Sequence, residues 1–160
     1  MKRLKLEGMR VIFKNFRGEK GTYNSEGDRS FSLVFDNTVV GEEIGHMGWA
    51  VKPLRNEEGE IETYHLPVKV NYGGRMPPRI YKVSVSGAGQ VLLEERTISM
   101  LDYLPIEYVD VILHPYEWEV RGESGVKAYC GTMYVVIEEN ELDLKWANFS
   151  KDDIPFEAEE

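Results

Sequence analysis

Basic and aromatic side chains are interleaved in one polar stretch near the N-terminus. The residues concerned are Lys14, Phe16, Arg17, Lys20 and Tyr23. Cationic side chains neutralise phosphates, and aromatic faces stack on unpaired bases. Because Phe16 and Tyr23 lie in a polar segment without the periodicity of a core, we expect both rings to be exposed. The chemistry that this stretch indicates is binding of a single-stranded nucleic acid.

A second basic segment runs from Leu66 to Lys82, with four basic residues and no acidic one. Its candidate phosphate-binding residues are Lys69, Arg75, Arg79 and Lys82. Tyr72 and Tyr81 are its candidate stacking residues, although a core position fits them equally well. Four further aromatic residues, Tyr116, Trp118, Tyr129 and Tyr134, lie on the last predicted hairpin. Aromatic residues on strands usually belong to the core, which is where we expect Phe13, Phe31, Phe35 and Trp118.

The charge distribution bears on whether a polyanion can bind. The net charge is -9, but residues 1–35 carry eight basic and four acidic residues, a local charge of +4. The acidic residues concentrate elsewhere, including the C-terminal end. A segregated pattern leaves basic surfaces available despite the acidic sum. The alternative is that the basic residues lie on solvated strand faces and bind no partner.

Patterns typical of enzymes and membrane proteins are missing from the sequence. His46, His65 and His114 lack metal-ligand spacing with Cys130, and no phosphate-binding loop or nucleophile motif occurs. We therefore expect no catalytic residue, metal or cofactor. No apolar run reaches the length of about 18 residues that suggests a membrane span, and the N-terminus does not resemble a signal peptide. A single cysteine permits no internal disulfide, which favours a cytoplasmic protein.

Alternating apolar residues predict a mainly β fold with six strands. We expect strands at 9–13, 30–35, 64–72, 80–85, 108–120 and 126–137, with Val91–Leu93 pairing briefly. Short helices are expected around 39–44, 94–104 and 140–148. The apolar set of the long strand changes faces near His114 and Pro115, which predicts a bulge there. A helix inserted before the last hairpin fits an OB-like Greek-key barrel.

The C-terminal segment, residues 150–160, reads SKDDIPFEAEE. Its Asp152, Asp153, Ile154, Pro155 and Phe156 resemble the acidic tip of bacterial single-stranded DNA-binding proteins, which recruits replication and repair partners. The segments NFRGEKGTYNSEGDRSF and HPYEWEVRGESGVKAY resemble compact phage-encoded proteins of this kind. The resemblance implies an OB-like domain over residues 1–149 and an acidic flexible tail over 150–160.

Residues and resemblance together predict a sequence-tolerant single-stranded DNA-binding protein that is not an enzyme. It would coat and protect unwound DNA during phage replication or recombination, in the host cytoplasm. Single-stranded DNA is the expected partner, with replication or recombination proteins binding the tail and a homo-oligomer as a further option. The alternative is an acidic protein–protein module, either a DNA-mimicking inhibitor of a host nuclease or CRISPR effector, or a small phage structural protein.

Overall fold

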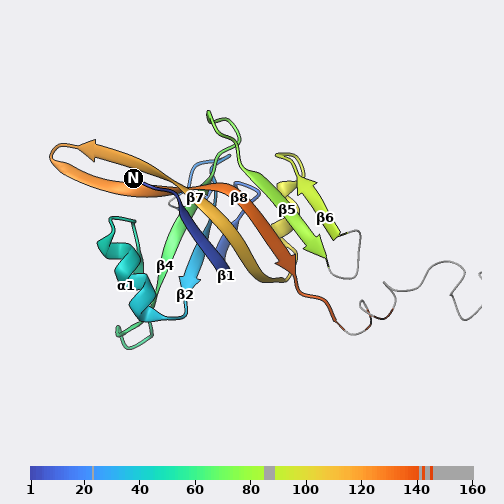
Figure 1. Cartoon of the computed structure of the whole chain (residues 1–160), viewed down its shortest axis with the longest axis horizontal. Coiled ribbons are helices and arrows are strands. Elements are labelled where there is room, and N and C mark those ends of the chain that lie inside the picture. The colour runs from blue at the N-terminus through green and yellow to red at the C-terminus, as the bar shows by residue number, and fades with distance from the viewer. Residues whose placement is uncertain (23, 85–88, 141, 143–144, 146–160) are drawn as a thin grey trace, which may run out of the picture.

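The computed structural model describes residues 1–22, 24–84, 89–140, 142 and 145 of the 160-residue chain. Strands dominate this described part, together with one α-helix and one 3-10 helix (Figure 1). In chain order the elements are β1 (Leu4–Asn15), β2 (Arg29–Phe35), α1 (Thr38–His46), β3 (Lys52–Arg55), β4 (Ile61–Val70), β5 (Arg79–Ser84), β6 (Gly89–Leu93), η1 (Ile98–Asp102), β7 (Ile106–Val120) and β8 (Glu123–Ile137).

Five of the strands close into a barrel. β1 pairs with β2 and β7, β2 pairs with β4, and β8 pairs with β7. The ring is completed where β4 runs parallel to β8, at Val68 opposite Ala128 and Lys69 opposite Tyr129. β3 extends the sheet beside β4, and the β5–β6 hairpin extends it beside β8. This connectivity is that of an OB-like Greek-key barrel, so the predicted fold class is confirmed.

Two bulges bend β1 around the barrel. Its register shifts between Leu6 and Met9 against β7, and between Ile12 and Asn15 against β2. Each bulge contains a residue with left-handed backbone, Gly8 with φ 64° and Phe13 with φ 52°. The second bulge turns Phe13 out of the barrel, where its side chain is 62% exposed. The prediction that Phe13 belongs to the core was therefore wrong, because sequence alternation does not reveal a bulge.

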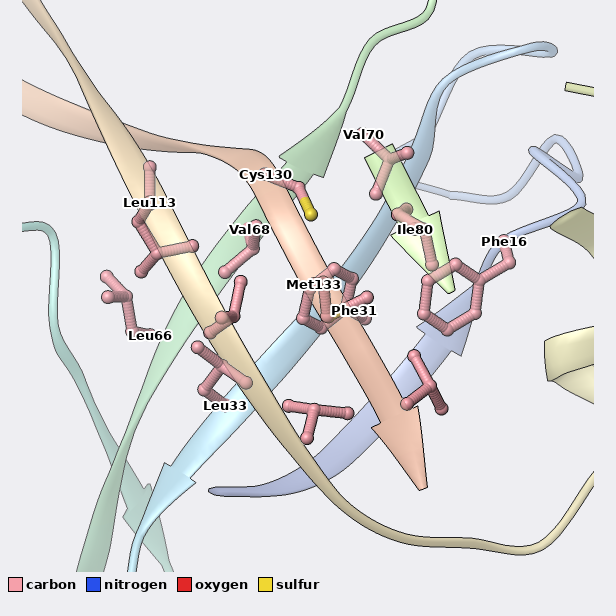
Figure 2. Close-up of a cluster of buried hydrophobic side chains, with 14 of the residues drawn as sticks. Phe16, Phe31, Leu33, Leu66, Val68, Val70, Ile80, Leu113, Cys130 and Met133 are labelled. Carbon is pink, nitrogen blue, oxygen red and sulfur yellow. The ribbon is translucent and has the colours of Figure 1, made fainter. Parts of the chain in front are cut away.

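Phe16 takes the core position that Phe13 leaves. Its side chain is fully buried, and its ring stacks on Phe31 with centroids 5.1 Å apart. Figure 2 shows it among the buried side chains of the barrel interior. The expectation that Phe16 is exposed was wrong. The polar residues around Phe16 in the sequence gave no sign that its ring is buried against Phe31. Phe31 and Phe35 are buried as predicted.

The β7–β8 hairpin projects beyond the barrel as a long arm (Figure 1). Pairing is regular from Leu113 opposite Cys130 to the tip, so no bulge occurs at His114 and Pro115. The register shifts instead between Val111 and Leu113, where β8 holds one residue more than β7, and again between Ile106 and Tyr108 at the start of β7. Trp118 lies on the arm against Gly125 and outside the main core cluster, which corrects its predicted core position.

The helices differ in how well the sequence predicted them. α1 is where it was expected, and the Asn37 side chain caps it by accepting from the Val39 amide. The helix predicted over 94–104 is only the 3-10 turn η1, because Thr97 bonds to the backbone of Glu94 and competes with helix formation. β3 was missed altogether, and most of the predicted 140–148 helix lies outside the described residues.

Candidate nucleic-acid interface

A row of polar and aromatic residues crosses the outer face of the barrel. Ser30 on β2 pairs with Lys69 on β4, Lys69 with Tyr129 on β8, and Tyr129 with His114 on β7. The residues preceding Lys69 and Tyr129, Val68 and Ala128, are buried in the core. Because side chains alternate along a strand, Lys69 and Tyr129 point outward.

A hollow of about 300 Å³ adjoins this row, between the arm and the loop that precedes β5. Its lining consists of Gly74, Arg75, Met76, His114, Pro115, Tyr116 and Tyr129. The Tyr116 and Tyr129 rings meet edge to face, with centroids 5.8 Å apart. Tyr116 is 54% exposed and Met76 is 61% exposed, so apolar surface is presented to solvent. Aromatic faces beside an Arg guanidinium can hold a base and its phosphate.

Cations surround the hollow. Lys69 lies next to Tyr129, Lys127 pairs with Tyr116 across the arm, and Arg75 lines the hollow itself. All three basic residues are exposed. None of them makes an ion pair with another described residue. Their charges therefore remain available to phosphates.

The predicted N-terminal basic residues have structural partners instead. Lys14 donates to the carbonyls of Leu101 and Leu104, each at 2.9 Å. Arg17 pairs with Glu19 and lies 3.8 Å from the Asp102 carboxylate, which together raise its pKa, the hydrogen bond to Glu19 contributing most. Of the other two predicted residues, Lys20 is exposed and Tyr23 lies outside the described residues.

Asp102 explains why this loop is held against η1. Its carboxylate is 3% exposed and accepts from the amides of Phe16 and Arg17, at 2.8 and 2.9 Å. Carboxylate–amide hydrogen bonds of this kind are strong. The 16–28 loop is thus fastened to the barrel at its first residues, beside the buried Phe16 ring. Sequence reasoning missed this anchor, because Asp102 is 86 residues from Phe16.

Tyr72 is half-buried and packs against the core. Arg29 lies over its ring, 6.0 Å from the centroid, and Arg29 also pairs with Glu95 at 3.4 Å. Burial raises the pKa of Tyr72 to about 12. Its hydroxyl is buried without a hydrogen-bond partner among the described residues. The structure therefore favours the core alternative for this residue.

Arg79 and Tyr81 lie on β5, where they pair with Thr132 and Tyr134 of β8. Tyr81 stacks on Tyr134 with centroids 4.9 Å apart, and Arg79 donates to the Tyr81 hydroxyl at 2.7 Å. Lys82 follows in the β5–β6 hairpin, opposite Val91. The structure thus places Arg75 in the lining of the hollow and Lys69 beside Tyr129, while Arg79, Tyr81 and Lys82 lie on β5. The DNA-binding residues predicted from the sequence did not include Met76, His114, Tyr116, Lys127 and Tyr129.

The tail segment with Asp152, Asp153, Ile154, Pro155 and Phe156 lies outside the described residues. In the part that is described, no group of three His, Cys, Asp or Glu residues could hold a metal ion. The described helices are also too short and too polar to cross a membrane.

The fold is similar to that of solved phage proteins. The structure is similar to the C-terminally truncated single-stranded DNA-binding protein of bacteriophage Enc34, with a TM-score of 0.53, 12% identity, and coverage of 86% of this chain and 87% of that one. The same phage protein in complex with ssDNA gives a TM-score of 0.52 at 12% identity, covering 86% and 88% of the two chains. At this identity the likeness shows a shared fold. No curated protein matches the sequence.

A family model covers the whole chain, residues 1–160, and is described as "Putative phage ssDNA-binding domain". This match decides between the two classes that the sequence left open, in favour of single-stranded DNA binding over an acidic DNA mimic or a phage structural protein. The chain belongs to the family of phage single-stranded DNA-binding domains.

Proposed function

We propose that the protein binds single-stranded DNA without sequence preference, through the outer face of β4 and β8 and the hollow beside it. The observation that carries this proposal is the cluster of Tyr116 and Tyr129 with three cations that pair with no other described residue, Lys69, Arg75 and Lys127. Every base has a π-face, so stacking on these rings tolerates any sequence. The Enc34 protein, which has a similar fold, was solved with ssDNA bound.

In this role the protein coats unwound phage DNA and protects it during replication or recombination, in the host cytoplasm. It acts by binding alone and catalyses no reaction. The net charge of -9 is compatible with a polyanionic ligand, because the basic residues Lys69, Arg75 and Lys127 make no ion pair within the part of the chain that the structure describes. Residues 1–149 form the binding domain in this proposal, and residues 150–160 form an acidic tail.

Fluorescence anisotropy with a labelled oligothymidylate tests the proposal. Tyr116→Ala and Tyr129→Ala should each weaken binding by about 1–3 kcal/mol, the usual contribution of one base–aromatic stack. Tyr103→Ala is the matched control, since Tyr103 is 75% exposed but follows η1 and does not line the hollow. Wild-type protein that fails to bind at low salt would overturn the proposed function. Equal losses in all three variants would overturn the proposed site.

Sequence tolerance and the absence of catalysis have their own readouts. A mixed-sequence oligonucleotide should compete nearly as well as oligothymidylate, whereas duplex DNA should compete poorly because its bases are already stacked. The labelled strand should stay intact after prolonged incubation with Mg²⁺. Degradation of the strand, or strong preference for one sequence, would contradict the proposal.

The tail is the proposed recruiting segment for replication or recombination proteins, through Asp152, Asp153, Ile154, Pro155 and Phe156. An acidic segment also competes with DNA for a basic surface. Deleting residues 150–160 should therefore raise the affinity for single-stranded DNA at low salt, with a smaller effect at high salt. An unchanged or weakened affinity after the deletion would contradict this competition.

A further inference from the structure

Phe13 combines an exposed aromatic ring with an unfavourable backbone conformation. Its φ of 52° lies in the left-handed region, which bulky side chains rarely adopt, and its side chain is 62% exposed. The ring gains little from burial, so core packing does not account for it. Backbone strain of this kind persists where the surrounding structure enforces it, and it clusters at functional sites. A glycine would suit the backbone of this bulge better.

The Phe13 ring lies on the same outer face of the barrel as the hollow. It meets the His65 imidazole edge to face, with centroids 5.4 Å apart and planes inclined by 74°. His65 and Lys69 are both on β4 and four residues apart, so both side chains project to the outer face. Four residues of strand span roughly 13 Å. A strand of DNA that contacts Tyr129 beside Lys69 can therefore continue along β4 to Phe13.

The charges near Phe13 suit a phosphate backbone. Lys52 pairs with His65 across β3 and β4, is exposed, and makes no ion pair with another described residue. Arg10 pairs with Val34, which in turn pairs with His65, so it lies in the same row. The guanidinium of Arg10 is bonded to Asp36 at 2.8 Å, which leaves Lys52 as the uncompensated cation of this end.

We propose that Phe13 is a second base-stacking platform, and that the DNA path runs from the Tyr116–Tyr129 hollow along β4 to Phe13 and Lys52. This inference rests on the proposed function and extends it by naming the far end of the interface. The perpendicular contact with His65 orients the Phe13 ring, and the bulge leaves its side chain 62% exposed. The two platforms then engage different bases of one bound strand.

Phe13→Gly separates a stacking role from a structural one. Glycine accepts the left-handed backbone, so the melting temperature should stay unchanged or rise, while the ring is lost. Affinity for an oligothymidylate long enough to reach both platforms should fall about five- to hundredfold, which corresponds to one lost stack. Phe13→Asn, which also tolerates this conformation, should give the same result. Phe13→Trp should retain the affinity.

Oligonucleotide length supplies the second readout. With oligothymidylates from about 4 to 16 nucleotides, the range of site sizes per OB fold, the shortest should bind wild type and Phe13→Gly equally well. The difference should appear only as the strand lengthens. Tyr129→Ala, by contrast, should weaken binding at every length.

The outcomes distinguish this inference from the proposed function. If wild type binds and Tyr129→Ala weakens binding, but Phe13→Gly binds long strands like wild type, only the second platform is wrong. A loss of affinity that tracks a fall in melting temperature would make Phe13 structural and would also overturn it. Concentration-dependent self-association that Phe13→Gly abolishes, without any change in DNA affinity, would assign the ring to a second copy of the chain.

Discussion

Lys69 and Tyr129 lie side by side on the outer face of the barrel, in the parallel pairing of β4 with β8 that closes it. This pairing spans only two residue positions, with Val68 and Ala128 forming the other. The inward members are buried in the core, and the outward members are a cation and an aromatic ring. This β4–β8 pairing, the seam of the barrel, thus places the proposed phosphate-binding group beside the proposed stacking group.

Lys69 and Tyr129 should have separable effects on DNA binding. Lys69→Gln should reduce the slope of log affinity against log salt by about 0.7, the contribution of one phosphate contact to a single strand. Tyr129→Ala should weaken binding at every salt concentration and leave the slope unchanged, because stacking releases no counterions. Anisotropy titrations across a range of salt concentrations measure both quantities.

Arg96→Gln is the control for the loss of a surface charge. Its side chain is 84% exposed, and it pairs with Glu94 before η1 rather than with a residue of the β4–β8 pairing. Its salt slope should match that of wild type. A slope for Lys69→Gln that equals those of wild type and Arg96→Gln would remove Lys69 from the interface.

Asp102 should contribute to stability through the loop that it anchors. Asp102→Ala leaves the amides of Phe16 and Arg17 without their acceptor. The loss should cost about 1–3 kcal/mol at the part-buried Phe16 amide and less at the exposed Arg17 amide, which water can solvate. Asp102→Asn keeps one acceptor oxygen and should lose less. Urea denaturation gives the free energy of unfolding of each variant.

Glu94→Gln is the matched control for Asp102, since the Glu94 carboxylate is exposed and, among the described residues, pairs only with the exposed guanidinium of Arg96. It should change the free energy of unfolding by less than about 0.5 kcal/mol. Comparable losses in Asp102→Ala and Glu94→Gln would mean that the anchor is not needed.

The fold class could be predicted because alternation survives over most of the strands. Phe31, Leu33 and Phe35 on β2 alternate with Ser30, Ser32 and Val34, and the odd-numbered set fills the core. The exposure of Phe13 and the burial of Phe16 could not be predicted. A bulge in β1 changes which residues face inward, and nothing in the local sequence marks that bulge. A basic loop residue likewise gives no sign of a distant carbonyl partner, as Lys14 shows with Leu101.

The binding face was only partly predictable for the same reason. Lys69 and Arg75 stood out as basic residues in an acid-free segment, and the structure places Arg75 in the lining of the hollow and Lys69 beside Tyr129. Tyr116 and Tyr129 were visible as strand aromatics, but the outward direction of Tyr129 depends on the bulge in β8. Long-range pairing of β4 with β8 decides which of these residues meet, and local sequence carries no information on it.

Gly131 should be intolerant of any side chain. An added Cβ would lie 2.6 Å from His114 Nε2 and 2.8 Å from the Ile112 carbonyl oxygen, which is backbone and cannot turn away. Gly131→Ala should lower the free energy of unfolding by about 1–3 kcal/mol, as other overpacked sites do. It should also weaken DNA binding, because His114 lines the hollow. Thermal and urea denaturation, with anisotropy on the folded protein, measure the two effects.

Gly21→Ala is the control, because a Cβ at Gly21 would meet nothing within 4 Å. It should leave stability and DNA affinity close to wild type. Adding His114→Ala to Gly131→Ala should recover only part of the stability, since the Ile112 carbonyl remains in place. Full recovery would locate the whole conflict at the imidazole.

His65 should make stability depend on pH. Its Nδ1 is buried without a partner among the described residues, and burial, with Lys52 nearby, lowers its pKa below the ordinary 6.5. Between these two values the unfolded chain binds more protons than the folded one, so the free energy of unfolding decreases as pH falls through this window. The His65 contribution is fully present above pH 6.5 and levels off below the folded pKa. His65→Gln should remove this component, measured as urea midpoints from neutral to mildly acidic pH, with the exposed His46→Gln as control. A profile for His65→Gln that falls as steeply as wild type would show that another group titrates.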